Sequence, residues 1–481
     1  MTTMRCVRSL TVVVVALAVC WGASQAAAQS GLAVTNFKAN EEIRYPAPLL
    51  EGTVSDAALT EVTVTNLASQ RPTREIKGIA YKGQFKALTE LVPGQNKLEI
   101  TAGSQKLPFT LTYKAQTNAY IVRVVFFVNS QGDTTVDSPR PVGPEDYKGR
   151  LDTALKLMQS FTAEWMNRHG YGRKTFNLEF DKDGRVIVHL VKDTQPTTQS
   201  GGRNSLFGRV SGLVHKALPP CQTSSTMVFL GKGCGYTALG GGGVALFGAD
   251  TQYTWPISLN EAQAAFMDAT PIDNKKYHCD DAGRGTFWGN SSTCIGAALH
   301  ELGHSFGLPH VADGRGIMSR GFDGFNRFWT LVEPACAKHA EPVEFTNSAW
   351  FSPVSAEALA SSRFFTLDAK TYADLPKTAI EFDTTKGVLT VKNPAGIGFL
   401  GLEIPGRADY FVPINHSKPL PKEFTIPFAQ IRDNVKLGAK DKNIQARVID
   451  AQGDMATKKV PATDVGFAAA TSAPTTAAAS K

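Results

Sequence analysis

The chain has 481 residues, 42% of them hydrophobic, so it is long enough for two to four domains with separate cores. Lysine and arginine outnumber the acidic residues by 50 to 43, giving a formal charge of +7 without a dense basic run. Aromatic and basic residues do not interleave either, so the composition gives no support to nucleic-acid binding.

The first thirty residues are typical of an export signal. Arg5 and Arg8 precede an apolar run from Leu10 to Trp21, and Ala26-Ala27-Ala28 offers a cleavage site of small side chains. The run is too short to span a bilayer comfortably, and no later segment is apolar for long enough. We therefore expect a signal peptide over residues 1–28 and a secreted, periplasmic or extracellular protein without a transmembrane segment.

Residues 29–116 alternate short apolar runs with turn signals. Glu61 to Thr65 and Gly83 to Leu88 are two such runs, and Pro93 to Asn96 forms a turn before the run from Lys97 to Thr101. Such spacing is typical of a small β-sandwich, so we predict an immunoglobulin-like N-terminal domain. It carries no candidate catalytic cluster, and a spacer role is the default expectation.

The composition changes near residue 118, where a different domain is expected to begin. Ala119 to Val128 is an apolar, β-branched run suited to a buried strand. Pro144 then precedes a helical pattern whose apolar positions are Leu151, Ala154, Leu155, Met158 and Phe161. Further strands are predicted over residues 175–180, 186–191 and 226–230. We expect an α+β domain over residues 117–360.

The pattern HExxHxxGxxH carries the functional prediction. His300 and His304 lie four positions apart, so on a helix their imidazoles share one face and can bind one Zn²⁺. Gly307 can adopt the left-handed conformation that ends a helix, which lets the chain return His310 as a third ligand. Three protein ligands leave a position open for water, and Glu301 is placed to take a proton from that water. A helix start is expected at the polar residues 290–293.

This motif resembles that of the metzincin zinc endopeptidases. The resemblance implies a methionine-containing turn beneath the metal, and Met318 lies a few residues past His310. Ser319-Arg320 follows where some metzincins place a tyrosine, so no tyrosine ligand is expected. The order of elements and the segment Gly316 to Trp329 are also similar to a little-characterised metallopeptidase family of bacteria and fungi, over roughly residues 31–440.

The metzincin resemblance also suggests where a substrate would lie. Metzincins hold an extended peptide against an edge strand above the zinc, by backbone pairing. The glycine cluster 240–243 leads here into a short apolar strand, and we assign it that role as a substrate edge strand: Val244, Ala245, Leu246 and Phe247. The alternative is a loop followed by an ordinary core strand.

Two of the seven cysteines fall in the signal segment and five surround the zinc motif: Cys221, Cys234, Cys279, Cys294 and Cys336. An exported chain permits disulfides, although their connectivity does not follow from sequence. Proximity alone favours Cys221 with Cys234 and Cys279 with Cys294. The absence of cysteine between residues 29 and 220 excludes a prosegment whose cysteine blocks the zinc.

The remaining residues return to β character. Strands are predicted within residues 378–382, 387–391 and 444–448, so we expect a second sandwich-like domain over residues 361–460. From Pro461 the chain becomes rich in alanine, threonine and serine, which predicts a disordered tail over residues 461–481.

The sequence therefore predicts an exported zinc endopeptidase with one catalytic Zn²⁺, whose partner is a protein or peptide substrate and in which Glu301 is the general base for a zinc-activated water. Two alternatives remain. A zinc amidase or deacetylase on a cell-wall or glycan amide would use the same water and base in a different cleft. A non-catalytic surface-binding protein would rely on its flanking domains, although the intact glutamate argues against that.

Overall fold

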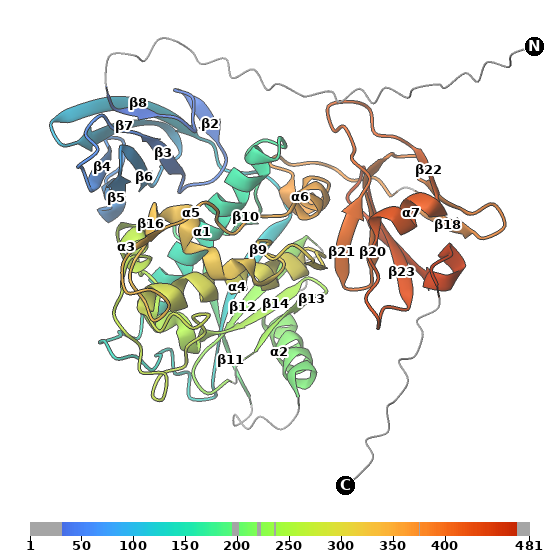
Figure 1. Cartoon of the computed structure of the whole chain (residues 1–481). Helices are drawn as coiled ribbons and strands as arrows, with labels where there is room; N and C mark the ends of the chain where they lie inside the picture. The colour runs from blue at the N-terminus through green and yellow to red at the C-terminus, as the bar shows by residue number, and fades with distance from the viewer. Residues whose placement is uncertain (1–30, 195–201, 219–222, 235–236, 375, 469–481) are drawn as a thin grey trace, which may run out of the picture.

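Three regions follow one another along the chain, coloured from blue to red in Figure 1. The computed structural model describes residues 31–194, 202–218, 223–234, 237–374 and 376–468. The predicted signal peptide over residues 1–28 and the last thirteen residues lie outside these ranges, as does Cys221. The predicted multidomain, mixed α/β architecture is confirmed, since strands dominate the first and last regions while helices cover a sheet in the middle.

The N-terminal region is built from eight strands: β1 (Ala33–Val34), β2 (Glu41–Ile43), β3 (Leu49–Thr53), β4 (Glu61–Asn66), β5 (Glu75–Tyr81), β6 (Gln84–Leu88), β7 (Gly94–Ala102) and β8 (Gln105–Tyr113). They pair in the continuous order β1-β3-β6-β5-β4-β7-β8-β2. Every second residue of β4 is buried, as expected for a strand with one face on a core, and Val62 and Val64 join that core. An immunoglobulin-like division into two sheets stays a prediction.

The central region holds a six-stranded sheet with helices: β9 (Ile121–Val128), β10 (Asn177–Leu178), β11 (Val188–Lys192), β12 (Ser224–Leu230), β13 (Ala238–Gly241), β14 (Val244–Gly248), α1 (Asp146–Arg168), α2 (Arg203–Ala217), α3 (Leu259–Ala265), α4 (Phe287–Ser305), α5 (Asn326–Trp329) and α6 (Pro353–Ala360). A small hairpin, β16 (Val332–Glu333) with β17 (Val343–Glu344), follows α5. Parallel pairing joins β10 and β11 to β9, β9 to β12 and β12 to β14. At the end of the order, β13 pairs with β14 antiparallel.

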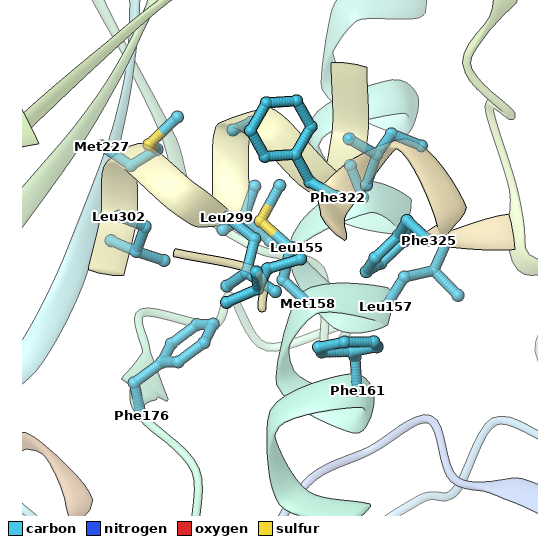
Figure 2. Close-up of a cluster of buried hydrophobic side chains, with 14 of the residues drawn as sticks. Leu155, Leu157, Met158, Phe161, Phe176, Met227, Leu299, Leu302, Phe322 and Phe325 are labelled. Carbon is cyan, nitrogen blue, oxygen red and sulfur yellow. The ribbon is translucent and has the colours of Figure 1, made fainter. Parts of the chain in front are cut away.

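Alternate residues of β9 serve the two faces of this sheet. Val124 and Phe126 belong to the large core beneath α1 and α4, whereas Val125 and Phe127 belong to a smaller core under α2. Figure 2 shows the larger core, where side chains of α1 meet those of α4 and of the segment after it: Leu155, Met158, Phe161, Leu299, Leu302, Phe322 and Phe325. Helices therefore cover both faces of the sheet, with α1 and α4 on one face and α2 on the other.

The C-terminal region has seven strands and one helix of its own: β18 (Ala379–Asp383), β19 (Val388–Lys392), β20 (Ile397–Ile404), β21 (Arg407–Phe411), β22 (Glu423–Pro427), β23 (Asn443–Asp450), β24 (Met455–Pro461) and α7 (Phe428–Asn434). A three-stranded sheet, β18-β19-β22, and a five-stranded sheet, β15-β21-β20-β23-β24, share one core. The strand β15 (His310–Val311) comes from the central region, so one sheet spans two regions.

The tail predicted from Pro461 begins too early. Residues 462–465 form a short 3-10 helix, and Ala462 and Val465 are buried in the C-terminal core. Apolar burial of these two side chains outweighs the low-complexity composition that follows them. Within the described ranges, no helix combines the length and the apolar character needed to cross a membrane.

No disulfide joins any two of the cysteines that the structure describes: Cys234, Cys279, Cys294 and Cys336. The predicted disulfide between Cys279 and Cys294 is therefore wrong. Cys294 lies inside α4, where its Sγ is 3.4 Å from the carbonyl oxygen of Asp280 and 3.4 Å from Oδ1 of Asn290. Because Cys221 lies outside the described ranges, its pairing with Cys234 is not tested.

Candidate metal centre

The helix that carries the motif begins earlier than its polar residues suggest. Thr286 is the N-cap of α4, and its hydroxyl accepts a hydrogen bond from the amide of Gly289 at 3.3 Å. The predicted capping residues lie inside the helix instead. Asn290 donates to the Thr251 carbonyl at 2.9 Å and Ser291 donates to the Thr254 carbonyl at 2.7 Å. These buried bonds tie α4 to the loop after β14, which explains polar residues within a helix.

Three imidazoles from the motif meet at one point. The Nε2 atoms of His300 and His304 are 3.0 Å apart, and those of His304 and His310 are 3.3 Å apart. The ligand atoms of all three residues lie within 4.8 Å of one another. The structure thus brings together the three predicted ligands, two from α4 and one from β15.

The hydrogen bonds made by Nδ1 of His300 and His304 orient their Nε2 atoms for binding a metal cation. Nδ1 of His300 is 2.7 Å from the Ile317 carbonyl, and Nδ1 of His304 is 2.7 Å from the Leu308 carbonyl. A carbonyl accepts only, so Nδ1 carries the proton and Nε2 presents a lone pair. Lone pairs that converge at 3 Å repel one another unless a cation lies between them. Neutral imidazoles of this kind are ligands that Zn²⁺ prefers, so the residues present could hold one such ion.

Burial sets the charge of the ionisable groups at this point. It lowers the pKa of His300 to about 3, with the nearby His304 adding to the effect, and it also lowers the pKa of His304. Both shifts favour the neutral form that binds metals. Glu301 is only 7% exposed, and burial raises the pKa of its carboxyl to about 7, partly opposed by Arg203. A carboxyl with such a pKa can both accept and release a proton near neutral pH.

The turn that returns the third histidine has the predicted conformation. Gly307 follows α4 with φ of +87°, in the region that residues with a side chain rarely adopt. The chain then enters β15, where the His310 amide donates to the Gly406 carbonyl at 3.1 Å. His310 is therefore placed by a backbone bond to the C-terminal region, a contact that the motif did not indicate.

Met318 lies beneath the helix. It is fully buried, and a Cβ added at Gly303 would come within 2.4 Å of its Sδ. The same turn offers the Ile317 carbonyl to His300 and the Met318 carbonyl to the amide of Val311 at 3.1 Å. This turn therefore links the helix-borne ligand with the strand that carries the third one.

The strand over residues 244–247 is not at the sheet edge, so that part of the prediction is wrong. Val244, Ala245, Leu246 and Phe247 form most of β14, which pairs with β12 on one side and β13 on the other. Among the described strands, the outermost on this side is β13, because the glycine cluster forms a turn that folds Ala238–Gly241 back along β14. A Cβ added at Gly240 would come within 2.2 Å of the Glu301 carbonyl oxygen and 2.6 Å of His304 Cβ.

Sequence reasoning also missed Arg203. It begins α2, donates to the Ala238 carbonyl at 2.6 Å and lies close enough to Glu301 to lower the pKa of that carboxyl. No local spacing relates residue 203 to the motif, so only the folded structure shows this contact.

Comparison with known proteins places the chain in a family. The sequence model of a family described as "Putative peptidase family" matches residues 31–205 and 229–394. The chain belongs to this family. Two fungal proteins are related to it: "Putative zinc metalloproteinase C607.06c" of Schizosaccharomyces pombe, 28% identical over 407 residues, and "Putative zinc metalloproteinase YIL108W" of Saccharomyces cerevisiae, 26% identical over 369 residues.

The two alignments cover 76% and 66% of this chain but only 64% and 51% of the fungal proteins, so the chain spans about two thirds or less of their lengths. Among solved structures, it is similar to the catalytically inactive OgpA of Akkermansia muciniphila in complex with an O-glycopeptide, with 18% identity and a TM-score of 0.44. That match covers 72% of this chain and 93% of OgpA. Wild-type OgpA matches over 72% of this chain and 92% of its own, with 20% identity and a TM-score of 0.43.

Proposed function

We propose that the protein is an exported zinc endopeptidase of metzincin type. The observation that carries the proposal is the convergence of three histidine Nε2 atoms, two of them oriented by carbonyls, beside the buried carboxyl of Glu301. Family membership and the names of the fungal relatives support the class of reaction. The antiparallel β13 at the end of an otherwise parallel sheet and Met318 beneath α4 support the metzincin type.

The residues of the chain divide the reaction between them. A Zn²⁺ ion held by His300, His304 and His310 would supply a Lewis acid that lowers the pKa of a water molecule and polarises the scissile carbonyl. Glu301 accepts a proton as the water oxygen bonds to the carbonyl carbon. It then passes that proton to the amine nitrogen as the carbon–nitrogen bond breaks.

The outer edge of β13 is the proposed substrate platform, in place of residues 244–247. An extended peptide could pair with this edge through its backbone, as in strand addition. Gly240 of β13 lies directly against the backbone carbonyl of Glu301 and the Cβ of His304, so a peptide paired with β13 would run alongside the part of α4 that carries the motif. The absence of a side chain at Gly240 permits this close packing of β13 on α4. Backbone pairing leaves side-chain preference to the surrounding loops.

The test is cleavage-site profiling of the zinc-loaded protein on a proteome-derived peptide library, with Glu301→Gln as the matched control. Glutamine keeps the shape of the side chain but cannot accept the proton, so we expect turnover to fall about 10²- to 10⁴-fold with the bound Zn²⁺ unchanged. New peptide termini from the wild type alone would support the assignment. Turnover by Glu301→Gln within twofold of wild type would show that another group is the base.

A further inference from the structure

We propose that the C-terminal region is part of the metal centre and that Arg447 is a positioning residue for the third ligand. This inference rests on one part of the proposed function, namely that the three histidines bind a metal ion. Its starting observation is that His310 lies in β15, the terminal strand of a sheet whose other four strands all belong to the C-terminal region. His310 pairs with Arg407 and Val311 with Ala408, in parallel register.

A second contact holds the turn before this strand. The guanidinium of Arg447, on β23, donates through Nη1 to the carbonyl of Gly307. Carbonyls at the end of a helix lack partners within the helix, and a cation there also interacts favourably with the helix dipole. The C-terminal region therefore contacts the four-residue path from Gly307 to His310 at both ends, once through a side chain and once through the backbone.

The Arg447 side chain is itself held in place. Its Nε and Nη2 donate to Oε1 of Glu403 on β20 at 3.1 and 2.8 Å, and Gln445 donates to the same oxygen at 2.7 Å. Glu403 is fully buried and Arg447 is 8% exposed. Because the carboxylate balances the guanidinium, the pair fixes geometry without adding net positive charge beside a dication. Met455 of β24 packs against the turn, since a Cβ at Gly307 would lie 3.2 Å from its Cε.

The three ligands thus have two different supports. His300 and His304 are fixed by α4 and by carbonyls of the central region, whereas His310 takes its position from a sheet of the C-terminal region. Displacing that sheet would move one ligand out of three. Groups that orient metal ligands typically contribute 10- to 100-fold in metal affinity.

The experiment measures Zn²⁺ affinity of the full-length protein by competition with a chromophoric chelator, and the visible spectrum after Co²⁺ substitution. Arg447→Met keeps an unbranched side chain of the length of the arginine's aliphatic part and removes the bond to Gly307, so we expect Zn²⁺ affinity to fall about 10- to 100-fold and the Co²⁺ bands to shift. Arg447→Lys, which keeps the charge, should recover part of the affinity. Arg432→Met is the matched control, because Arg432 donates to the Val465 carbonyl at 2.8 Å in the same region.

The outcomes separate the two proposals. If Arg447→Met binds Zn²⁺ with an affinity within twofold of the wild type and has the same Co²⁺ spectrum, the positioning role is overturned. Should Arg447→Met not fold, Glu403→Gln provides the same test, because it weakens the support of Arg447 with little change in volume. An equal loss in the control would mean a general effect of domain stability and would also overturn the role. If the wild type binds Zn²⁺ and Arg447→Met weakens it, but no peptide is cleaved, the positioning role stands and the endopeptidase proposal fails.

Discussion

The two β-rich regions that flank the central region contact it in different ways. The N-terminal region packs on α1, a helix that carries no candidate site residue, through buried polar and apolar contacts. Its Lys86 also donates to the Arg327 and Phe328 carbonyls of α5, at 3.1 and 2.8 Å. The Lys156 ammonium on α1 lies 2.8 Å from Glu90, and the Tyr45 hydroxyl donates to Glu164 at 2.6 Å. The C-terminal region instead contacts the path between the second and third histidines.

This difference separates two properties that a domain interface can support. Contacts to α1 stabilise the fold but lie behind the helix that presents the histidines, so their loss should leave the metal centre intact. Contacts to β15 act on a ligand directly, so their loss should lower metal affinity more than stability. Measuring both quantities on the same variants tests whether the regions differ as the structure implies.

The largest expected change in stability comes from Lys156→Met. This substitution leaves the carboxylates of Glu90 and Asp152 without the buried ammonium that lies within 2.9 Å of each. Removing one partner of a buried ion pair typically costs about 3–5 kcal/mol of unfolding free energy. We expect such a loss in urea unfolding of the metal-free protein, with Zn²⁺ affinity within twofold of wild type.

Lys148→Met on the same helix is the control, because Lys148 is exposed and pairs with an exposed Glu145. It should change neither quantity measurably. A loss of Zn²⁺ affinity in Lys156→Met as large as that in Arg447→Met would remove the distinction between the two flanking regions.

A loss of stability of intermediate size is expected from Gly303→Ala, a substitution on α4. Alanine favours a helix interior over glycine by about 1 kcal/mol, but the new Cβ would stand 2.4 Å from Met318 Sδ. Overpacking typically costs about 1–3 kcal/mol, so stability should fall by up to about 2 kcal/mol.

Because the turn that holds Met318 also holds His300 through the Ile317 carbonyl, Zn²⁺ affinity should fall in the same variant, by several-fold. The two measurements are urea unfolding of the metal-free protein and chelator competition. No change in either would show that Met318 can move without disturbing the turn.

The parts of the site that could be predicted depend on short-range geometry. His300 and His304 share a helix face because of their spacing, and Gly307 ends that helix because its left-handed φ suits glycine. The apolar runs behind β9 and α1 also identify core elements, because burial leaves a periodic pattern.

The remaining features depend on contacts between distant residues. The polar residues Asn290 and Ser291 suggest a helix cap locally, yet they bond to a loop some 36 to 39 positions away. Similarly, Arg447 is 140 positions from Gly307, and no spacing rule joins a charged residue on one strand to a turn in another region. The position of β13 at the sheet edge follows from the tight glycine turn and not from the apolar pattern of β14.

The smallest effect is expected from Arg407→Ala. Arg407 is opposite His310 in the pairing of β15 with β21, but that pairing uses the backbone, whereas the Arg407 guanidinium donates to the Lys436 carbonyl at 2.8 Å. Alanine keeps the backbone in place, so Zn²⁺ affinity in the chelator competition should stay within twofold of wild type. Because Arg407 is paired with His310, this variant tests whether a positive charge near the ligand affects Zn²⁺ affinity by itself.

If Arg407→Ala changed affinity as much as Arg447→Met, a cation near the histidines would matter in itself, and the bonds to the turn would not. If only Arg447→Met weakens binding, the effect belongs to the bond between its guanidinium and the Gly307 carbonyl. In that case the C-terminal region acts on the metal centre through the geometry of two contacts, in contrast to the buried ion pair between the N-terminal region and α1, which acts through stability.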